Sequence, residues 1–148
     1  MNKFKSILQS IGAVIAGYLV SAILTAFTIA ALGALLPESY SAENIAWVLV
    51  NVIYGCVFAV IGGYVVARLA PARPFTHATV LGLWMAIFAV ITGYAISATP
   101  PSPEYANQPG WYYPVLAITV LPSILLGAWL YVRGIRGTIQ PTLAIQNL

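Results

Sequence analysis

Residues 45–69 decide the fold; they read IAWVLVNVIYGCVFAVIGGYVVARL, with no charged side chain before Arg68. An α-helix needs about 20 mostly apolar residues to cross the ~30 Å hydrocarbon core of a bilayer. A barrel strand would instead alternate apolar and polar residues over about 10 positions. Because this run is long and continuously apolar, it predicts a transmembrane helix.

Three further apolar runs have the same character, at roughly 7–36, 75–98 and 112–132. The chain has 148 residues, of which 61% are hydrophobic and only 6% charged, whereas an average soluble protein is about one quarter charged. The first run is much longer than the ~7–15 apolar residues of a signal peptide, which predicts an uncleaved span. We therefore predict an all-α membrane protein, a four-helix up-down transmembrane bundle over residues 1–136, with a tail at 137–148.

The charged residues fall into two groups separated by these runs. Glu38, Glu43 and Glu104 follow the first and third runs. All six basic residues lie before the first run, between the second and third, or after the fourth: Lys3, Lys5, Arg68, Arg73, Arg133 and Arg136. Short loops rich in Lys and Arg stay in the cytoplasm. The pattern predicts a multi-pass protein of the bacterial cytoplasmic (inner) membrane, with both termini cytoplasmic.

Small residues recur every four positions in the second run, at Gly55, Ala59, Gly63 and Ala67. Small side chains at this spacing allow two membrane helices to approach closely. Gly82 in the third run and Gly17 in the first belong to similar rows. These residues predict a helix-packing interface, either within one bundle or with a second membrane protein.

Polar side chains within the spans gather in the half nearer the acidic loops: Asn51, Tyr54, Thr25 and Thr28. One interpretation is hydrogen bonding between helices, worth ~0.6 kcal/mol per bond in a membrane, or to the residue's own helix. The other is a small polar cavity inside the bundle. Pro122 in the fourth run predicts a kink that would shape such a cavity, and Ser123 can help to satisfy the freed carbonyls.

Groups that carry chemistry are scarce. No acidic or basic residue lies near the middle of a span, although charge-coupled transport usually needs one. Small multidrug exporters have a similar size but depend on a glutamate in the first span. Cys56 is the only cysteine and is interpreted as a buried apolar residue. His77 is the only histidine and cannot form a metal site alone. The sequence thus predicts no enzyme, metal, cofactor or nucleic-acid partner.

The two halves of the chain show a weak similarity. A shift of 65 residues places Gly62 on Gly127 and Arg68 on Arg133, which suggests two repeated helical hairpins of parallel orientation. The segment 62–70, the pair at 77–78, and the segments 111–112, 121–122 and 127–128 also resemble a group of small bacterial four-span proteins with no assigned activity. The resemblance implies a fold and a compartment only.

Two functions remain compatible with these observations. The leading hypothesis is a structural or accessory subunit that packs through its small-residue rows in a homo- or hetero-oligomer within the lipid bilayer. The alternative is binding or passage of a lipid, a quinone or a small neutral solute in a cavity at Asn51, Tyr54, Thr25 and Thr28.

Overall fold

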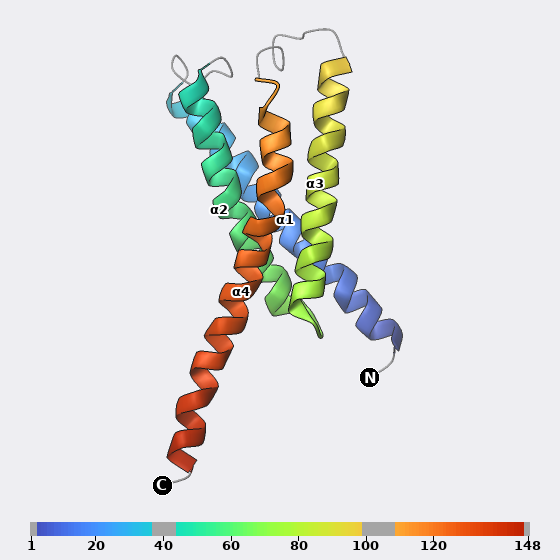
Figure 1. The fold of residues 1–148 in the computed structure, drawn as a ribbon, viewed down its shortest axis with the longest axis vertical. Coiled ribbons are helices and arrows are strands. Elements are labelled where there is room, and N and C mark those ends of the chain that lie inside the picture. The colour runs from blue at the N-terminus through green and yellow to red at the C-terminus, as the bar shows by residue number, and fades with distance from the viewer. Residues whose placement is uncertain (1–2, 37–43, 99–108, 147–148) are drawn as a thin grey trace.

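The structure is a computed structural model that describes residues 3–36, 44–98 and 109–146, with 135–146 described as backbone. It is an all-α bundle of four helices (Figure 1): α1 Lys3–Leu35, α2 Ile45–Leu69, α3 Pro74–Ala98 and α4 Tyr112–Gln146. Each is long and apolar enough to cross a membrane. The chain is therefore a multi-pass integral membrane protein. The three glutamates and most of the proline-rich segment after α3 lie outside the described residues.

Local chemistry sets the helix ends. Asn44 is the N-cap of α2, and its side chain accepts a hydrogen bond from the Ala46 N–H at 3.0 Å. At the other end of α2 the Ala70 N–H donates to the Val66 carbonyl. Pro74 is the first residue of α3, a position where a missing N–H costs nothing. In the short turn between α2 and α3, Arg73 adopts a left-handed conformation, with φ of 50°.

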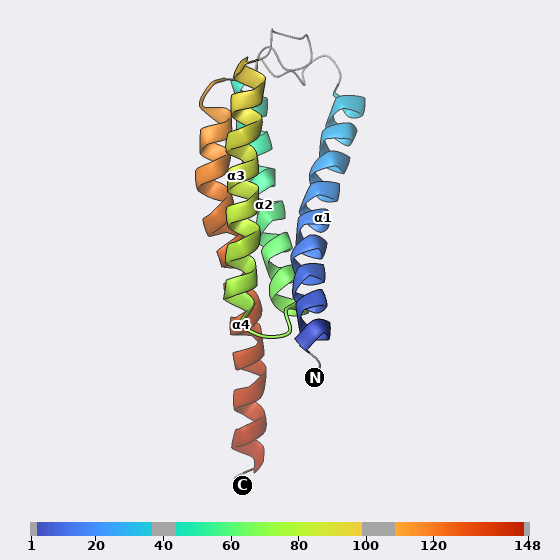
Figure 2. The ribbon, with the colours of Figure 1, turned by 90° about the vertical axis from the view of Figure 1, so that its right-hand side faces the viewer.

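α2 lies at the centre of the bundle and packs against each of the other three helices. We call the end of the bundle marked by Lys5, Arg68 and Arg73 the basic end, and the opposite end the Asn44 end. α1 passes behind α3 in the lower part of Figure 1, and the two helices lie apart at the Asn44 end in both views (Figures 1 and 2). The bundle is therefore closed at its basic half and splayed at the other.

Glycine creates the close contacts of the closed half. A Cβ atom on Gly17 would lie 2.8 Å from the Gly62 carbonyl oxygen, and a Cβ on Gly62 would lie 2.8 Å from that of Gly17. A Cβ on Gly63 would overlap the backbone of Ile124, whose carbonyl carbon would be 2.8 Å away. A Cβ on Gly127 would lie 2.7 Å from the Tyr64 nitrogen. The backbones of α1 and α4 thus touch that of α2 directly.

The core forms around these crossings. Val66, Leu81, Ile124 and Ala128 are completely buried there. Large apolar side chains elsewhere are exposed, as Phe27 at 73% and Ile118 at 74% illustrate. An exposed apolar surface of this kind suits hydrocarbon and not water.

α4 continues beyond 132, the predicted end of the fourth span, and extends past the other helices at the basic end (Figure 2). It also continues through Pro122 without a break. A proline removes the hydrogen bond to the carbonyl four residues before it, which here is that of Ile118. The Ser123 hydroxyl donates to the neighbouring Thr119 carbonyl at 2.8 Å, so it does not replace the bond that is lost.

Candidate functional site

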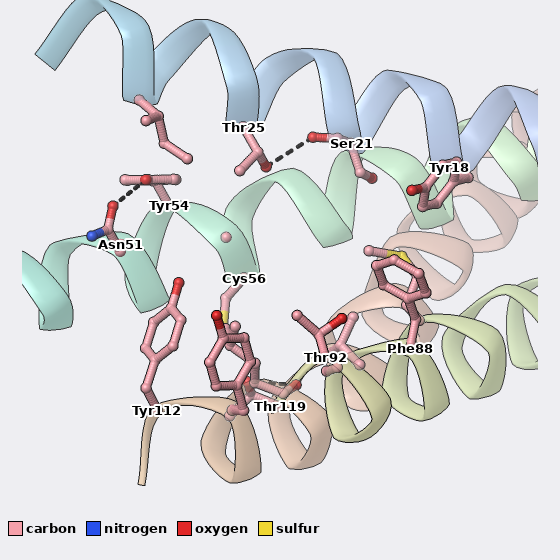
Figure 3. Close-up of a pocket in the computed structure, with 17 residues that line it drawn as sticks. Tyr18, Ser21, Thr25, Asn51, Tyr54, Cys56, Phe88, Thr92, Tyr112 and Thr119 are labelled. Atoms are coloured by element: carbon pink, nitrogen blue, oxygen red, sulfur yellow. Dashed lines mark hydrogen bonds between the residues drawn. The ribbon is translucent and has the colours of Figure 1, made fainter. Parts of the chain in front are cut away.

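A cavity of about 250 Å³ lies in the splayed half of the bundle, and all four helices contribute to it (Figure 3). α1 and α2 form one side of it, and α3 and α4 the other. The side chains labelled in the figure are Tyr18, Ser21, Thr25, Asn51, Tyr54, Cys56, Phe88, Thr92, Tyr112 and Thr119. Among the described residues, no charged side chain lines it.

Three of the four residues predicted for a polar cavity line this one: Asn51, Tyr54 and Thr25. The Tyr54 hydroxyl donates a hydrogen bond to the Asn51 side-chain oxygen. Thr28, the fourth of these residues, is not among those that line the cavity, and its hydroxyl donates to the Leu24 carbonyl of its own helix at 2.8 Å. The next residue, Ile29, lines the cavity in its place.

Three hydroxyl groups of the cavity already donate their proton within the protein. Thr25 donates to the Ser21 carbonyl at 2.9 Å, and Thr119 donates to the Val115 carbonyl at 2.8 Å. Ser21 is buried and lies within hydrogen-bond distance of two carbonyl oxygens, Phe58 at 3.0 Å and Gly17 at 3.2 Å. A hydroxyl has one proton and two lone pairs. These three side chains can therefore accept hydrogen bonds from a ligand but cannot donate hydrogen bonds to it.

Two further hydroxyls supply the donors. Tyr18 on α1 and Thr92 on α3 line the cavity, and neither hydroxyl has a hydrogen-bond partner within the part of the chain that the structure describes. Neither residue was predicted from the sequence. A signal for Tyr18 was present, because Tyr18, Ser21 and Thr25 stand at i, i+3 and i+7 and so share one helix face. Thr92 follows Phe88 at i+4 in the same way.

The cavity opens to the outside of the bundle between α1 and α3. Phe88 on α3 and Ile29 on α1 both line it, yet they are 52% and 46% exposed. α1 and α3 are also the two helices that diverge here (Figures 1 and 2). A molecule dissolved in the bilayer therefore has a lateral route to the cavity.

The small-residue rows serve two different purposes. Gly17, Ala59, Gly63, Ala67 and Gly82 are buried inside the bundle. A Cβ on Gly82 would press on the Leu121 side chain, with the Leu121 Cα at 3.3 Å. Gly55 is different. It lines the cavity, and no atom of another helix lies within 4 Å of the place its Cβ would take, so it makes no close packing contact within the described bundle. Its role in packing against a second membrane protein stays a prediction.

Two residues without an assigned role can now be placed. Cys56 is half-buried and lines the cavity, so it is less enclosed than the sequence suggested. His77 lies in the first turn of α3 at the basic end, away from the cavity. Among the described residues, no three His, Cys, Asp or Glu side chains lie close enough to hold a metal ion together.

Comparison of the chain with protein-family models, curated proteins and solved structures finds no match. The resemblance to small bacterial four-span proteins therefore stays a prediction. A functional assignment rests on the geometry of the cavity.

Proposed function

We propose that this membrane protein binds a neutral, ring-headed lipid of the quinone class in the cavity between its four helices. The observation that supports the proposal most directly is an aromatic-rich cavity that opens toward the bilayer. Its described lining carries no charge and includes two hydroxyl donors that have no hydrogen-bond partner among the described residues, Tyr18 and Thr92. We propose a binding function and not an enzyme, in the bacterial inner membrane with both termini in the cytoplasm.

The residues that line the cavity favour an uncharged ligand. Burying an ion in an apolar site is costly unless an opposite charge is present, and the described residues that line the cavity include no charged side chain. Aromatic rings from α1, α2, α3 and α4 line it instead: Tyr18, Tyr54, Phe88, Tyr112 and Tyr113. Aromatic side chains favour a flat ring through stacked or edge-to-face contacts. The two carbonyl oxygens of a quinone ring would accept hydrogen bonds from Tyr18 and Thr92.

The size of the cavity favours a headgroup over a whole ligand. Drug-sized ligands occupy pockets of about 300–1,000 Å³, and this cavity has about 250 Å³. That volume corresponds to about eight water molecules at ~30 Å³ each. A single ring with its substituents fits such a space, while an isoprenoid tail would leave through the opening between α1 and α3.

Binding of a short-tailed benzoquinone to the purified protein in mild detergent tests the proposal. A ligand that binds only the folded state stabilises it by about 2.7 kcal/mol at 100 times its Kd, so the midpoint of thermal unfolding should rise with quinone concentration. A neutral diacylglycerol serves as the comparison. Stabilisation by diacylglycerol alone would indicate an ordinary lipid site, and no stabilisation by the quinone would refute the proposal.

Two variants localise the effect. Tyr18→Phe and Thr92→Val each remove one donor at nearly constant volume. The loss of one hydrogen bond of about 1 kcal/mol should weaken quinone binding about fivefold. Tyr94→Phe is the matched control, because Tyr94 is 76% exposed and lies on the outside of the same helix as Thr92. If all three variants bind the quinone equally, the donors do not contact it.

A third variant fills the cavity. Gly55→Leu places a side chain into the space, since no atom lies within 4 Å of its Cβ position. Gly12→Leu is its control: Gly12 is an exposed helical glycine whose Cβ position is also unobstructed. We expect Gly55→Leu to abolish quinone binding and Gly12→Leu to retain it. Equal binding by both variants would place the ligand elsewhere.

The accessory-subunit hypothesis receives less support from these contacts. It depended on the small-residue rows, and the structure places Gly17, Gly63 and Gly82 against neighbouring helices of the same chain. Light scattering of the detergent-purified protein would test it independently, because an accessory subunit should purify as an oligomer or with a partner.

A further inference from the structure

A second cavity, separate from the quinone site, lies between α1 and α3 at the basic end. This crevice has a volume of about 330 Å³. α1 contributes four residues and α3 three, including Ile11, Val14, Ile15, Thr76, His77 and Val80. It lies where the two helices begin, on the opposite half of the bundle from the first cavity.

The crevice has a wall made almost entirely of carbon and is open on one side. Ile11, Ile15 and Val80 line it, and each is about half exposed, at 52%, 51% and 52%. An open apolar crevice at membrane depth must be filled by hydrocarbon, since the bilayer core contains no water. A lipid acyl chain has the shape and chemistry for this, and its headgroup would then lie beyond the first turn of α3.

Two polar groups at this turn are available to a headgroup. The His77 Nδ1 atom lies 3.1 Å from the Arg73 carbonyl oxygen. A carbonyl can only accept, so Nδ1 carries the proton of this bond. That leaves Nε2 without a protein partner among the described residues, and the Thr76 hydroxyl has none there either. The threonine hydroxyl can donate to a phosphate oxygen, and Nε2 can form a hydrogen bond with another polar atom of the headgroup.

The basic residues around the crevice favour an anionic headgroup. Arg73 stands immediately before α3, and Arg68 lies in the last turn of α2; both are exposed. No Asp or Glu occurs in the described parts of the chain, and the three glutamates of the sequence belong to other segments. Basic residues next to the membrane attract anionic lipids. A neutral headgroup such as phosphocholine would gain less here, because its own ammonium group would meet Arg73.

We propose that the crevice between α1 and α3 binds one anionic phospholipid from the leaflet at the basic end. One acyl chain lies along Ile11, Ile15 and Val80, the phosphate is bound by Arg73 and Thr76, and His77 contacts the rest of the headgroup. The proposal does not depend on the quinone site.

Native mass spectrometry of the delipidated full-length protein tests this. The probes are phosphatidylglycerol and phosphatidylcholine with identical acyl chains, added in turn and in competition. We expect one phosphatidylglycerol to be retained per chain, in clear preference to phosphatidylcholine. Equal retention of the two lipids would overturn the proposal, and this comparison needs no variant.

Matched substitutions identify the headgroup contacts. Arg73→Gln should weaken phosphatidylglycerol binding about fivefold, since one basic residue near the membrane surface contributes about 1 kcal/mol. Arg133→Gln is the control, because the Arg133 guanidinium lies 4.9 Å from the Trp129 ring on α4. Thr76→Val should weaken binding, whereas Thr79→Val should not, since the Thr79 hydroxyl already donates to the Phe75 carbonyl. Equal affinities within each pair would refute the assigned contacts.

Inorganic phosphate separates a lipid site from a simple anion site. Millimolar phosphate should not displace phosphatidylglycerol, because the acyl chain supplies much of the affinity. Val80→Trp, which fills the crevice, should reduce lipid binding about as strongly as Arg73→Gln. Displacement by phosphate together with full binding to Val80→Trp would show that the crevice holds no acyl chain.

Discussion

The two halves of α2 use the same residue type in opposite ways. In the half toward the basic end, Gly62 and Gly63 allow α1 and α4 to touch the α2 backbone, and a Cβ on either would overlap a neighbour. In the half toward the Asn44 end, Gly55 lines a cavity and has no atom within 4 Å of its Cβ position. One helix thus holds the bundle together along one half and leaves it open along the other.

A small residue therefore permits close helix packing but does not by itself produce it. Spacing of four residues places Gly55, Ala59 and Gly63 in one row, and every member of the row permits a close approach. Whether the approach occurs depends on the facing helix. Opposite Gly63 lies the backbone of Ile124, while around Gly55 the neighbouring helices contribute bulky aromatic side chains to the cavity. Three substitutions test whether the two halves of α2 differ in this way.

The largest effect is expected for Gly63→Ala. The added methyl group would overlap the Ile124 backbone, which cannot rotate away as a side chain can. Overpacking of a core typically costs about 1–3 kcal/mol, so the free energy of unfolding in detergent, measured by SDS titration, should fall by about this amount. An unchanged unfolding free energy would mean that α2 and α4 do not cross at Gly63.

Gly55→Ala should have the opposite sign. Glycine inside a helix is less stable than alanine by roughly 0.5–1 kcal/mol, and the space at Gly55 is open, so no clash offsets the gain. The same SDS titration should show a modest stabilisation. A loss comparable to that of Gly63→Ala would remove the distinction between the two halves and would show that the splayed half closes in solution.

The fold was readily predicted from the sequence because membrane burial imposes a simple rule on long apolar runs. The span limits at 45–69 agree with α2, and those at 75–98 agree with α3 to one residue. The end of α4 was not predicted, because the segment after Arg136 is only mildly apolar and shows no clear period. Helix continuation there depends on local backbone preference, which a hydropathy pattern does not report.

The cavity was predicted only in part, because the sequence records which side chains are polar but not where helices diverge. Asn51, Tyr54 and Thr25 were found as polar residues within spans, and all three line the cavity. Tyr18 and Phe88 were overlooked since aromatic residues are common in any span. Thr28 was grouped with Thr25 because the two hydroxyls look alike in the sequence. Each donates to a carbonyl of its own helix, but only Thr25 lines the cavity.

Ser21→Ala should have the smallest effect of the three, and it probes the boundary between the closed and splayed halves. Ser21 is 2% exposed and lies beside the crossing of Gly17 and Gly62. Its hydroxyl lies 3.0 Å from the Phe58 carbonyl oxygen on α2, which makes it a hydrogen-bond donor from one helix to another. Such bonds contribute about 0.6 kcal/mol on average in a membrane, so the unfolding free energy should fall by about that amount.

Ser10→Ala is the matched control for this substitution, because the Ser10 hydroxyl donates at 2.9 Å to the Ser6 carbonyl of its own helix. Removing it breaks no bond between helices and should leave the unfolding free energy nearly unchanged. If the two serine variants have the same unfolding free energy, the contact between α1 and α2 depends on glycine packing alone. α1 would then diverge from α2 beyond Gly17, the last residue of their close contact. Ser21 would line the cavity but would not determine where the cavity ends toward the basic end.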